Sequence, residues 1–189
     1  MKKGLLFGSF NPIHSGHLQI ATFFLDQTDL EDIWFVVSPQ NPLKENRTLL
    51  DPNHRLELVN LAIESNKHMI CSDIEMTLPM PSYTIDTLDL IKEKYPDHCF
   101  VIIMGTDSLE SLSNWKDHHR ILEEYQIYAY PRNGYKGGAY ISHPSVKLFR
   151  SGFLEVSATE LRKKIRQGSS DQWLPEKVAS LIKERGFYL

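Results

Sequence analysis

The chain has 189 residues and a mass of 21.9 kDa, which is room for one compact domain and too little for two full ones. Its composition, 41% hydrophobic and 24% charged, is typical of a globular protein and excludes collagen-like and disordered classes. With 21 Lys and Arg against 24 Asp and Glu, the net charge of −3 offers no whole-molecule attraction to nucleic acid or an anionic membrane, so bound phosphate must be held locally. Two cysteines, Cys71 and Cys99, and the lack of a membrane-spanning apolar run favour a cytoplasmic protein in a reducing environment.

Short apolar runs alternate along the chain with helical patterns, which predicts βαβ units around a mostly parallel sheet. Residues 33–37 and 100–104 are apolar without interruption, as expected of strands that are covered on both faces. The fold class is therefore α/β, a doubly wound sheet with helices on both faces and a helical segment near the end of the sequence. The predicted strands span residues 3–9, 33–38, 69–75, 99–104, 125–130 and 146–149.

Helix boundaries are marked by capping residues. Asp51 precedes a proline at a first helical position, and Ser157 has the spacing of a capping box with Glu160. Gly168 and Gly186 are placed to end the last two helices. Helices are thus predicted to begin near residues 16, 52, 84, 158 and 175, and the glycine-rich stretch 132–145 is predicted to be a surface loop. We expect one domain, with a sheet core over about residues 1–150 and phosphate-binding helices over about 151–189.

The segment GSFNPIHSGHL, residues 8–18, leaves the first predicted strand and enters a helix near Gly16. Ligands of open α/β sheets bind at this end of a strand, and a helix start with an unhindered glycine can face a phosphate. His14 and His17 can project to one side of the turn and donate hydrogen bonds to phosphate oxygens. The alternatives are capping or core histidines and a zinc site, but no third ligand or H-E-x-x-H motif is near, so we assign no metal ligand.

A second segment, residues 156–162, contains Ser157 and Thr159 at a helix start, followed closely by basic residues. Cations near a helix N-terminus oppose the helix dipole, and a bound anion would reverse that effect. A solvated basic face explains Lys163, Lys164 and Arg166. Arg162, next to the cap in sequence, is expected to contact phosphate.

Together these segments resemble the nucleotidyltransferases with an H-x-G-H signature, and within them the bacterial nicotinate-nucleotide adenylyltransferase branch. The family pattern G-G-T/S-F-D/N-P-I-H-x-G-H matches residues 8–17, with Phe7 in place of the first glycine. The pattern I-S-S-T-x-[IL]-R matches residues 156–162, with Val156 and Ala158 as replacements. Between them, P-x-x-P-x-K resembles residues 39–44, followed by Arg55 in the next helix, S-Y-T-x-D-T resembles residues 82–87, and G-x-D resembles residues 105–107, with Trp115 and Arg132 downstream. The resemblance covers nearly the whole chain, in order.

The resemblance implies a Rossmann-like fold and transfer of AMP from ATP to nicotinate mononucleotide, which yields deamido-NAD and pyrophosphate in NAD biosynthesis. It implies catalytic roles for His14, His17 and Arg162, and a Mg²⁺ ion bound through the ATP phosphates. The implied ATP-binding residues are Gly8, Ser9, Phe10, Gly16, Gly105, Asp107, Ser157 and Thr159. Those implied for the acceptor nucleotide are Asn11, Lys44, Tyr83, Thr84, Trp115 and Arg132.

Other interpretations stay open at this point. A related enzyme could use another acceptor: nicotinamide mononucleotide or phosphopantetheine with ATP, or a phosphoalcohol with CTP. The S-Y-T-x-D-T segment argues against phosphopantetheine and against a phosphoalcohol. A nucleotide-binding sensor without turnover is a third hypothesis. Trp115 could instead cap the core, and Ser82 and Thr84 could be helix caps. The oligomeric state, the preference for acid over amide, the effects of Phe7 and Ala158, and which of the loops 41–50 and 132–145 closes on substrate are not determined by the sequence.

Overall fold

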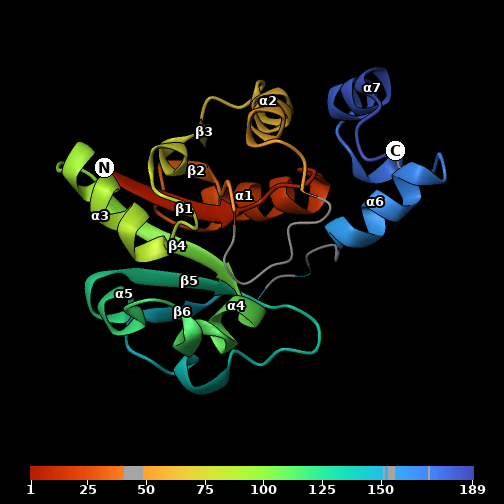
Figure 1. Ribbon diagram of the computed structural model, residues 1–189. Coiled ribbons are helices and arrows are strands. Elements are labelled where there is room, and N and C mark those ends of the chain that lie inside the picture. The colour runs from red at the N-terminus through yellow and green to blue at the C-terminus, as the bar shows by residue number, and fades with distance from the viewer. Residues whose placement is uncertain (41–48, 151, 153–155, 170) are drawn as a thin grey trace.

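The computed structural model of the chain describes residues 1–40, 49–150, 152, 156–169 and 171–189. Its centre is a six-stranded sheet in the order β3-β2-β1-β4-β5-β6, and every pairing between these strands is parallel. Figure 1 shows the strands running through the middle of the molecule, with helices on either side. The strands are β1 (Lys2–Gly8), β2 (Asp32–Val37), β3 (Met69–Ser72), β4 (Cys99–Gly105), β5 (Gln126–Tyr130) and β6 (Val146–Leu148). The predicted α/β class and parallel sheet are confirmed.

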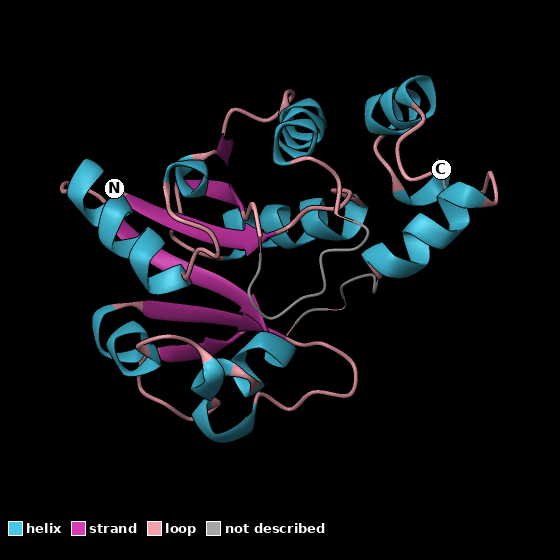
Figure 2. Ribbon diagram, viewed as in Figure 1, coloured by secondary structure: helices cyan, strands magenta, loops and turns pink. Residues whose placement is uncertain are grey.

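Two hydrophobic clusters lie on the two faces of this sheet because successive strand residues point to opposite sides. The first cluster contains Leu6, Phe35 and Ile103 from the strands, together with buried residues of α1, α2, α6 and α7. The second contains strand neighbours such as Leu5 and Ile102, and it is covered by α3, α4 and α5. Figure 2 shows this layering of helices about the sheet. The last two helices therefore share a hydrophobic cluster with the sheet.

The helices are α1 (Ser15–Gln27), α2 (Pro52–Ile63), α3 (Thr84–Lys94), α4 (Thr106–Glu110), α5 (His118–Glu124), α6 (Ala158–Arg166) and α7 (Glu176–Arg185). Several predicted boundaries are confirmed by their caps. The Asp51 side chain accepts a hydrogen bond from the N–H of Asn53, and Ser157 accepts one from the N–H of Glu160. Gly186 ends α7 with a φ of 65°, a left-handed conformation that glycine adopts without strain. None of the helices in the described part of the chain is both long and apolar enough to cross a membrane.

Two local expectations were wrong or incomplete. The third strand was predicted to reach residue 75, but it stops at Ser72, and residues Ile74–Thr77 form a 3₁₀ turn. The turn follows because the carboxylate of Glu75 is drawn into the protein by hydroxyl groups of Ser82 and Thr87, which a continuing strand would not bring close. The short helices α4 and α5 between β4 and β5 were also missed, since each is too short to show a clear periodicity.

The strand order places a topological switch point between β1 and β4. The chain proceeds from β1 to β2 and β3 on one side, and from β4 to β5 and β6 on the other. The connections after β1 and β4 therefore leave in opposite directions, and a crevice forms at the carboxyl ends of these strands. In Figure 1, α6 lies beyond this end of the sheet, so a distant part of the chain faces the crevice.

Candidate nucleotide-binding site

A cavity of about 370 Å³ opens at the switch point. Its walls come from the loop after β1, the start of α1, the starts of α4 and α6, and the residues that follow β5. Most residues that the sequence proposed for catalysis and ATP binding line it. These are His14, His17, Arg162, Gly8, Ser9, Phe10, Gly16, Asp107, Ser157 and Thr159, together with Asn11 and Arg132 from the proposed acceptor set.

The two histidines stand side by side at the start of α1. Their rings are stacked, with centroids 3.7 Å apart and planes inclined by 23°. The backbone N–H of His14 donates a hydrogen bond to Nδ1 of His17 over 3.3 Å. A neutral His17 ring therefore carries its proton on Nε2, where it can be donated to a ligand. The expected common orientation of the two rings is observed.

His14 is held neutral by its surroundings. Its side chain is only 5% exposed, and burial, assisted by the positive charge of Arg132, lowers the pKa of His14 to about 4. At pH 7 the ring is an uncharged hydrogen-bond donor rather than a cation. Its Nδ1 atom is buried and lacks a hydrogen-bond partner within the described part of the chain. The site thus contains a buried polar atom that a ligand could satisfy.

Phe10 shapes the loop that carries these histidines. It has a φ of 45°, and its side chain is 2% exposed, packing edge-on against His17 at a centroid distance of 5.0 Å. A Cβ atom on Gly8 would lie 2.9 Å from the Phe10 ring, so the glycine allows the ring to fold under the loop. The Phe10 ring therefore belongs to the core, and its contribution to the cavity is to support the loop and His17.

Arg162 connects the start of α6 with the loop after β1. Its Nη1 donates to the backbone carbonyl of Asn11 over 2.8 Å, and its Nη2 donates to the hydroxyl of Thr159 over 3.2 Å. The bond to Asn11 joins residues 151 positions apart in sequence. An arginine has five N–H donors, so a guanidinium fixed in this way can still donate to a bound anion.

Arg132 places a second positive charge, besides that of Arg162, at the cavity. The backbone N–H of Arg132 donates to the Thr106 hydroxyl over 2.8 Å, and Nε lies 3.9 Å from Oδ2 of Asp107. Gly105 does not line the cavity, although the sequence proposed it for ATP binding. A Cβ atom there would lie 2.3 Å from Oδ1 of Asp107 and 2.7 Å from Cγ of Arg132. Gly105 is needed because these two side chains pass directly over its backbone.

The charges that line the cavity are Arg132 and Arg162 against the single carboxylate of Asp107, among the described residues. This balance, with two histidine rings and the starts of two helices, suits an anionic ligand. In the described part of the chain, His, Cys, Asp and Glu side chains do not gather in groups of three that could hold a metal ion.

Arg55, which the sequence analysis placed only in a helix, is the anchor of the loops around the cavity. It is fully buried, and its guanidinium group donates to four backbone carbonyls. It reaches the loops after β1 and β2 and the residues before α2. The acceptors are Ser9 at 2.6 Å, Ser38 at 2.7 Å, Pro39 at 2.8 Å and Leu50 at 2.8 Å. An arginine on the apolar face of an amphipathic helix, in line with Val59 and Ile63, was the available signal for this role.

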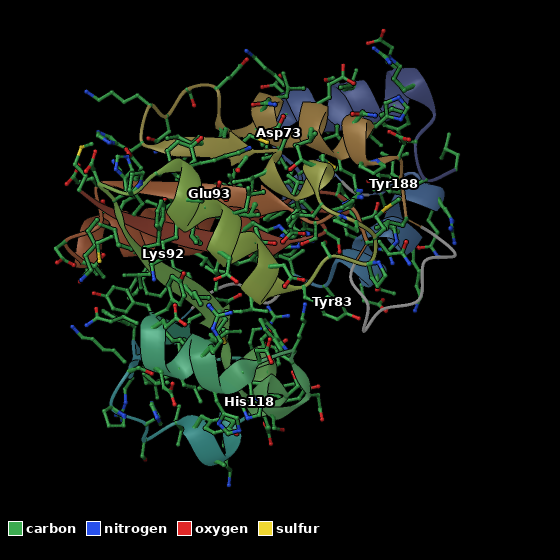
Figure 3. The ribbon with its side chains drawn as sticks, turned by 60° about the vertical axis from the view of Figure 1, so that its left-hand side comes forward. Asp73, Tyr83, Lys92, Glu93, His118 and Tyr188 are labelled. Atoms are coloured by element: carbon green, nitrogen blue, oxygen red, sulfur yellow. The ribbon has the colours of Figure 1, made fainter. Side chains whose placement is uncertain are left out.

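Part of the proposed acceptor set lies at the start of α3 and not in this cavity, whereas Asn11 and Arg132 line it. Tyr83, which is 37% exposed, precedes α3 directly, and Figure 3 shows it at the opposite end of that helix from Lys92 and Glu93. The ammonium group of Lys116 lies 5.2 Å from the Tyr83 ring centroid, which brings the neighbourhood of Trp115 to the start of α3. Tyr83, Thr84 and Trp115 do not line the cavity that contains the histidines, and Lys44 lies outside the described residues. The alternative that Ser82 and Thr84 cap this helix is wrong, because Tyr83 occupies the cap position and no side chain caps α3.

Comparison with known proteins gives the family. A model of the cytidylyltransferase-like family matches residues 5–164. Proteins named probable nicotinate-nucleotide adenylyltransferase from Cytophaga hutchinsonii and Flavobacterium johnsoniae are 47% and 46% identical to the chain, and the matches cover 100% of this chain and 98% and 99% of theirs. The chain belongs to the nicotinate-nucleotide adenylyltransferase family.

Solved structures agree with this assignment at the level of the fold. A Plasmodium falciparum nicotinic acid mononucleotide adenylyltransferase complexed with NaAD has a TM-score of 0.83, with 19% identity over 99% of this chain and 97% of that one. As a member of this nucleotidyltransferase family, the chain has the enzyme class and the Rossmann-like fold that the sequence motifs implied.

The three replacements in the two terminal motifs, Phe7, Val156 and Ala158, all lie at the cavity. Phe7 and Ala158 line it, one at the end of β1 and the other as the first residue of α6. Ala158 lacks a hydroxyl, but its neighbours Ser157 and Thr159 retain theirs. The histidines and arginines that the motifs propose for the site are therefore all present at the cavity despite the three replacements.

Proposed function

We propose that this chain transfers AMP from ATP to nicotinate mononucleotide, releasing pyrophosphate and forming deamido-NAD as a step of NAD biosynthesis. The observation that carries this proposal is the stacked His14–His17 pair, which lines one cavity together with Arg162 and Arg132. The family assignment supports the choice of acceptor, since the similar proteins named above carry the name of this enzyme.

The chemistry requires charge stabilisation more than proton transfer. A phosphate oxygen of the acceptor attacks the α-phosphorus of ATP, a new P–O bond forms, and the bond to the β-phosphate breaks as pyrophosphate leaves. The attacking oxygen is already anionic at neutral pH, so a general base is not needed. Nε2–H of His17 and the neutral ring of His14 donate to the triphosphate, while Arg162 and the start of α6 hold the β- and γ-phosphates.

We propose that a divalent cation, Mg²⁺, binds through the ATP phosphates and supplies additional neutralisation of their charge. Mg²⁺ retains several waters and commonly binds through substrate phosphates, which fits a cavity lined mainly by hydrogen-bond donors. No protein ligand of the ion is assigned. The chain's own contribution is to orient the triphosphate between the histidines and the arginines.

For the acceptor, we propose a second part of the site at the start of α3. Tyr83 and Thr84 would bind the nicotinate carboxylate through backbone or hydroxyl donors, and Trp115 would stack on the pyridine ring. The indole N–H of Trp115 is buried without a partner among the described residues, which is consistent with a binding role. Asn11, Lys44 and Arg132 complete the proposed set, and Asn11 accepts a hydrogen bond from the N–H of Leu50 at the edge of the cavity.

The test is pyrophosphate release with ATP and Mg²⁺, with nicotinate mononucleotide, nicotinamide mononucleotide or phosphopantetheine as acceptor, and product identification by mass. Strong preference for nicotinate mononucleotide supports the proposal. Preference for another acceptor would retain the phosphate chemistry and overturn the acceptor assignment. ATP binding without turnover of any acceptor would indicate a non-catalytic sensor.

A further inference from the structure

A buried carboxylate lies directly beneath the proposed acceptor segment. Glu75, in the 3₁₀ turn Ile74–Thr77, is 3% exposed. Its Oε2 accepts a hydrogen bond from the Ser82 hydroxyl over 3.0 Å, and its Oε1 accepts one from the Thr87 hydroxyl over 3.0 Å. Two of the motif's hydroxyls, on either side of Tyr83 and Thr84, thus point inward to one carboxylate.

Hydroxyl groups rather than cations hold this carboxylate in the described part of the chain. Burial raises the pKa of Glu75, and hydrogen bonds from Ser38, Ser82 and Thr87 oppose that rise by stabilising the charged form. The Thr87 hydroxyl also lies 3.2 Å from the backbone carbonyl of Tyr83, so the first turn of α3 is fixed at two points. Buried hydrogen bonds to a carboxyl group are directional, which makes them suited to holding a segment in one position.

Ser38 extends this hydrogen-bond network to the loop after β1, which leads to His14. Its hydroxyl interacts with Glu75, its N–H donates to the carbonyl of Gly8 over 2.9 Å, and its carbonyl accepts from Arg55 over 2.7 Å. The same Nη1 atom of Arg55 donates to the carbonyl of Ser9 over 2.6 Å. A chain of buried and partly buried hydrogen bonds therefore runs from the start of α3 to the loop that precedes His14.

We propose that Glu75 is a positioning residue that fixes the start of α3, and with it Tyr83 and Thr84, relative to the ATP-binding loop. In a two-substrate transfer, the acceptor phosphate must approach the α-phosphorus from a defined distance and direction, and small displacements lower the rate strongly. This inference rests on the proposed function, because that function assigns the acceptor nucleotide to Tyr83 and Thr84. In this proposal the side chains of Glu75, Ser82 and Thr87 position the segment and do not themselves contact the nucleotide.

The experiment compares Glu75→Ala and Glu75→Gln with Glu93→Gln, which alters an exposed carboxylate at the far end of α3 (Figure 3). For Glu75→Ala we expect KM for nicotinate mononucleotide to rise about tenfold or more while KM for ATP changes less than about twofold. Gln retains one carbonyl acceptor and should restore most of the loss. Glu93→Gln should match the wild type. An equal rise in both KM values, or no change in either with folded protein, overturns the proposal.

A second pair of variants serves if Glu75→Ala does not fold. Thr87→Val removes one hydroxyl with little change in shape, whereas Thr87→Ser retains it. We expect Thr87→Val to raise KM for nicotinate mononucleotide about threefold to tenfold, and Thr87→Ser to restore it.

Amide hydrogen exchange without ligands separates this proposal from the proposed function. In Thr87→Val, the amides of residues 83–87 should exchange about tenfold faster than in the wild type, while those of α5 remain unchanged. Unchanged exchange at residues 83–87 would refute the positioning role even if the enzyme is active. If the variant shows faster exchange at those residues but the wild type does not use nicotinate mononucleotide, the proposed function is refuted and the structural role of Glu75 is retained.

Discussion

Because His14 is buried as a neutral ring, the stability of the protein should fall as the pH is lowered through the range where free histidine becomes protonated. The unfolded chain binds a proton at His14 with a pKa of 6.5, whereas the folded chain does so with a pKa of about 4. Between these values the unfolded state holds more protons, so the free energy of unfolding decreases as pH falls. The contribution of His14 to this loss is about 2 kcal/mol at pH 5 and about 3 kcal/mol at pH 4.

The assay is urea unfolding followed by tryptophan fluorescence at several pH values, for the wild type and for His14→Gln. Gln does not titrate, and the other ionisable groups change alike in both proteins, so the difference between the two pH profiles isolates His14. We expect the wild type to lose about 2 kcal/mol more than the variant between pH 7 and pH 5. Parallel profiles would show that His14 titrates normally in the folded protein and would refute its burial as a neutral donor.

The same logic predicts that ATP counteracts the effect, because the triphosphate brings negative charge to the ring. ATP binding should raise the pKa of His14 and draw a fraction of a proton from solution near pH 6. Calorimetry in buffers with different ionisation enthalpies measures this uptake. His14→Gln should bind ATP with less proton uptake than the wild type, and equal uptake would place the titrating group elsewhere.

Three further substitutions test the remaining parts of the site. His17→Ala should lower kcat by about 10²-fold to 10³-fold while changing the free energy of unfolding by less than about 1 kcal/mol; loss of stability in step with activity would return His17 to a core role. Arg55→Met should destabilise the fold by about 3 kcal/mol or more in urea unfolding, because four buried or partly buried carbonyls lose their donor. Arg55→Lys should recover only a small part of this loss, and full recovery by Lys would contradict the multidentate role. Gly105→Ala should reduce kcat/KM for ATP at least about tenfold, because the added Cβ displaces the side chains of Asp107 and Arg132. The control Gly152→Ala has open space around its Cβ and should match the wild type in the same kinetic assay.

The loop between β1 and α1 was predictable from the spacing of residues within it. The turn between β1 and α1 depends on residues that lie within ten positions of one another, so the spacing of Gly8, His14, Gly16 and His17 already indicates that both histidines lie on one side of it. The sheet was predictable for a similar reason, because a strand that is covered on both faces must be apolar, as residues 33–37 of β2 and 100–104 of β4 are.

What the sequence could not reveal depends on contacts between distant segments. Ser82 is an ordinary capping candidate until Glu75 is found beneath it, and the 3₁₀ turn that places Glu75 there has no periodic pattern of its own. Arg55 appears as one cation on a helix, yet its acceptors belong to loops that follow two different strands. For both residues the role of the side chain is set by the partner that the fold brings to it, a buried carboxylate for Ser82 and backbone carbonyls for Arg55, and that information is absent from local spacing.

The arrangement of charge in the cavity explains why neutral histidines and permanent cations occur together. Burial and the positive charge of Arg132 lower the pKa of His14, so the cation that we propose attracts the triphosphate also helps to keep the nearby ring uncharged. A buried second cation would be expensive before ATP arrives, whereas a neutral N–H donor is already oriented and gains strength as negative charge develops on the phosphate oxygens. Arg162 completes this arrangement only when α6 docks on the loop after β1, through its bond to Asn11. The docking of α6 on the loop after β1 is therefore needed to complete the proposed phosphate site, and a variant that loosens α6 should lose ATP affinity before it loses the sheet.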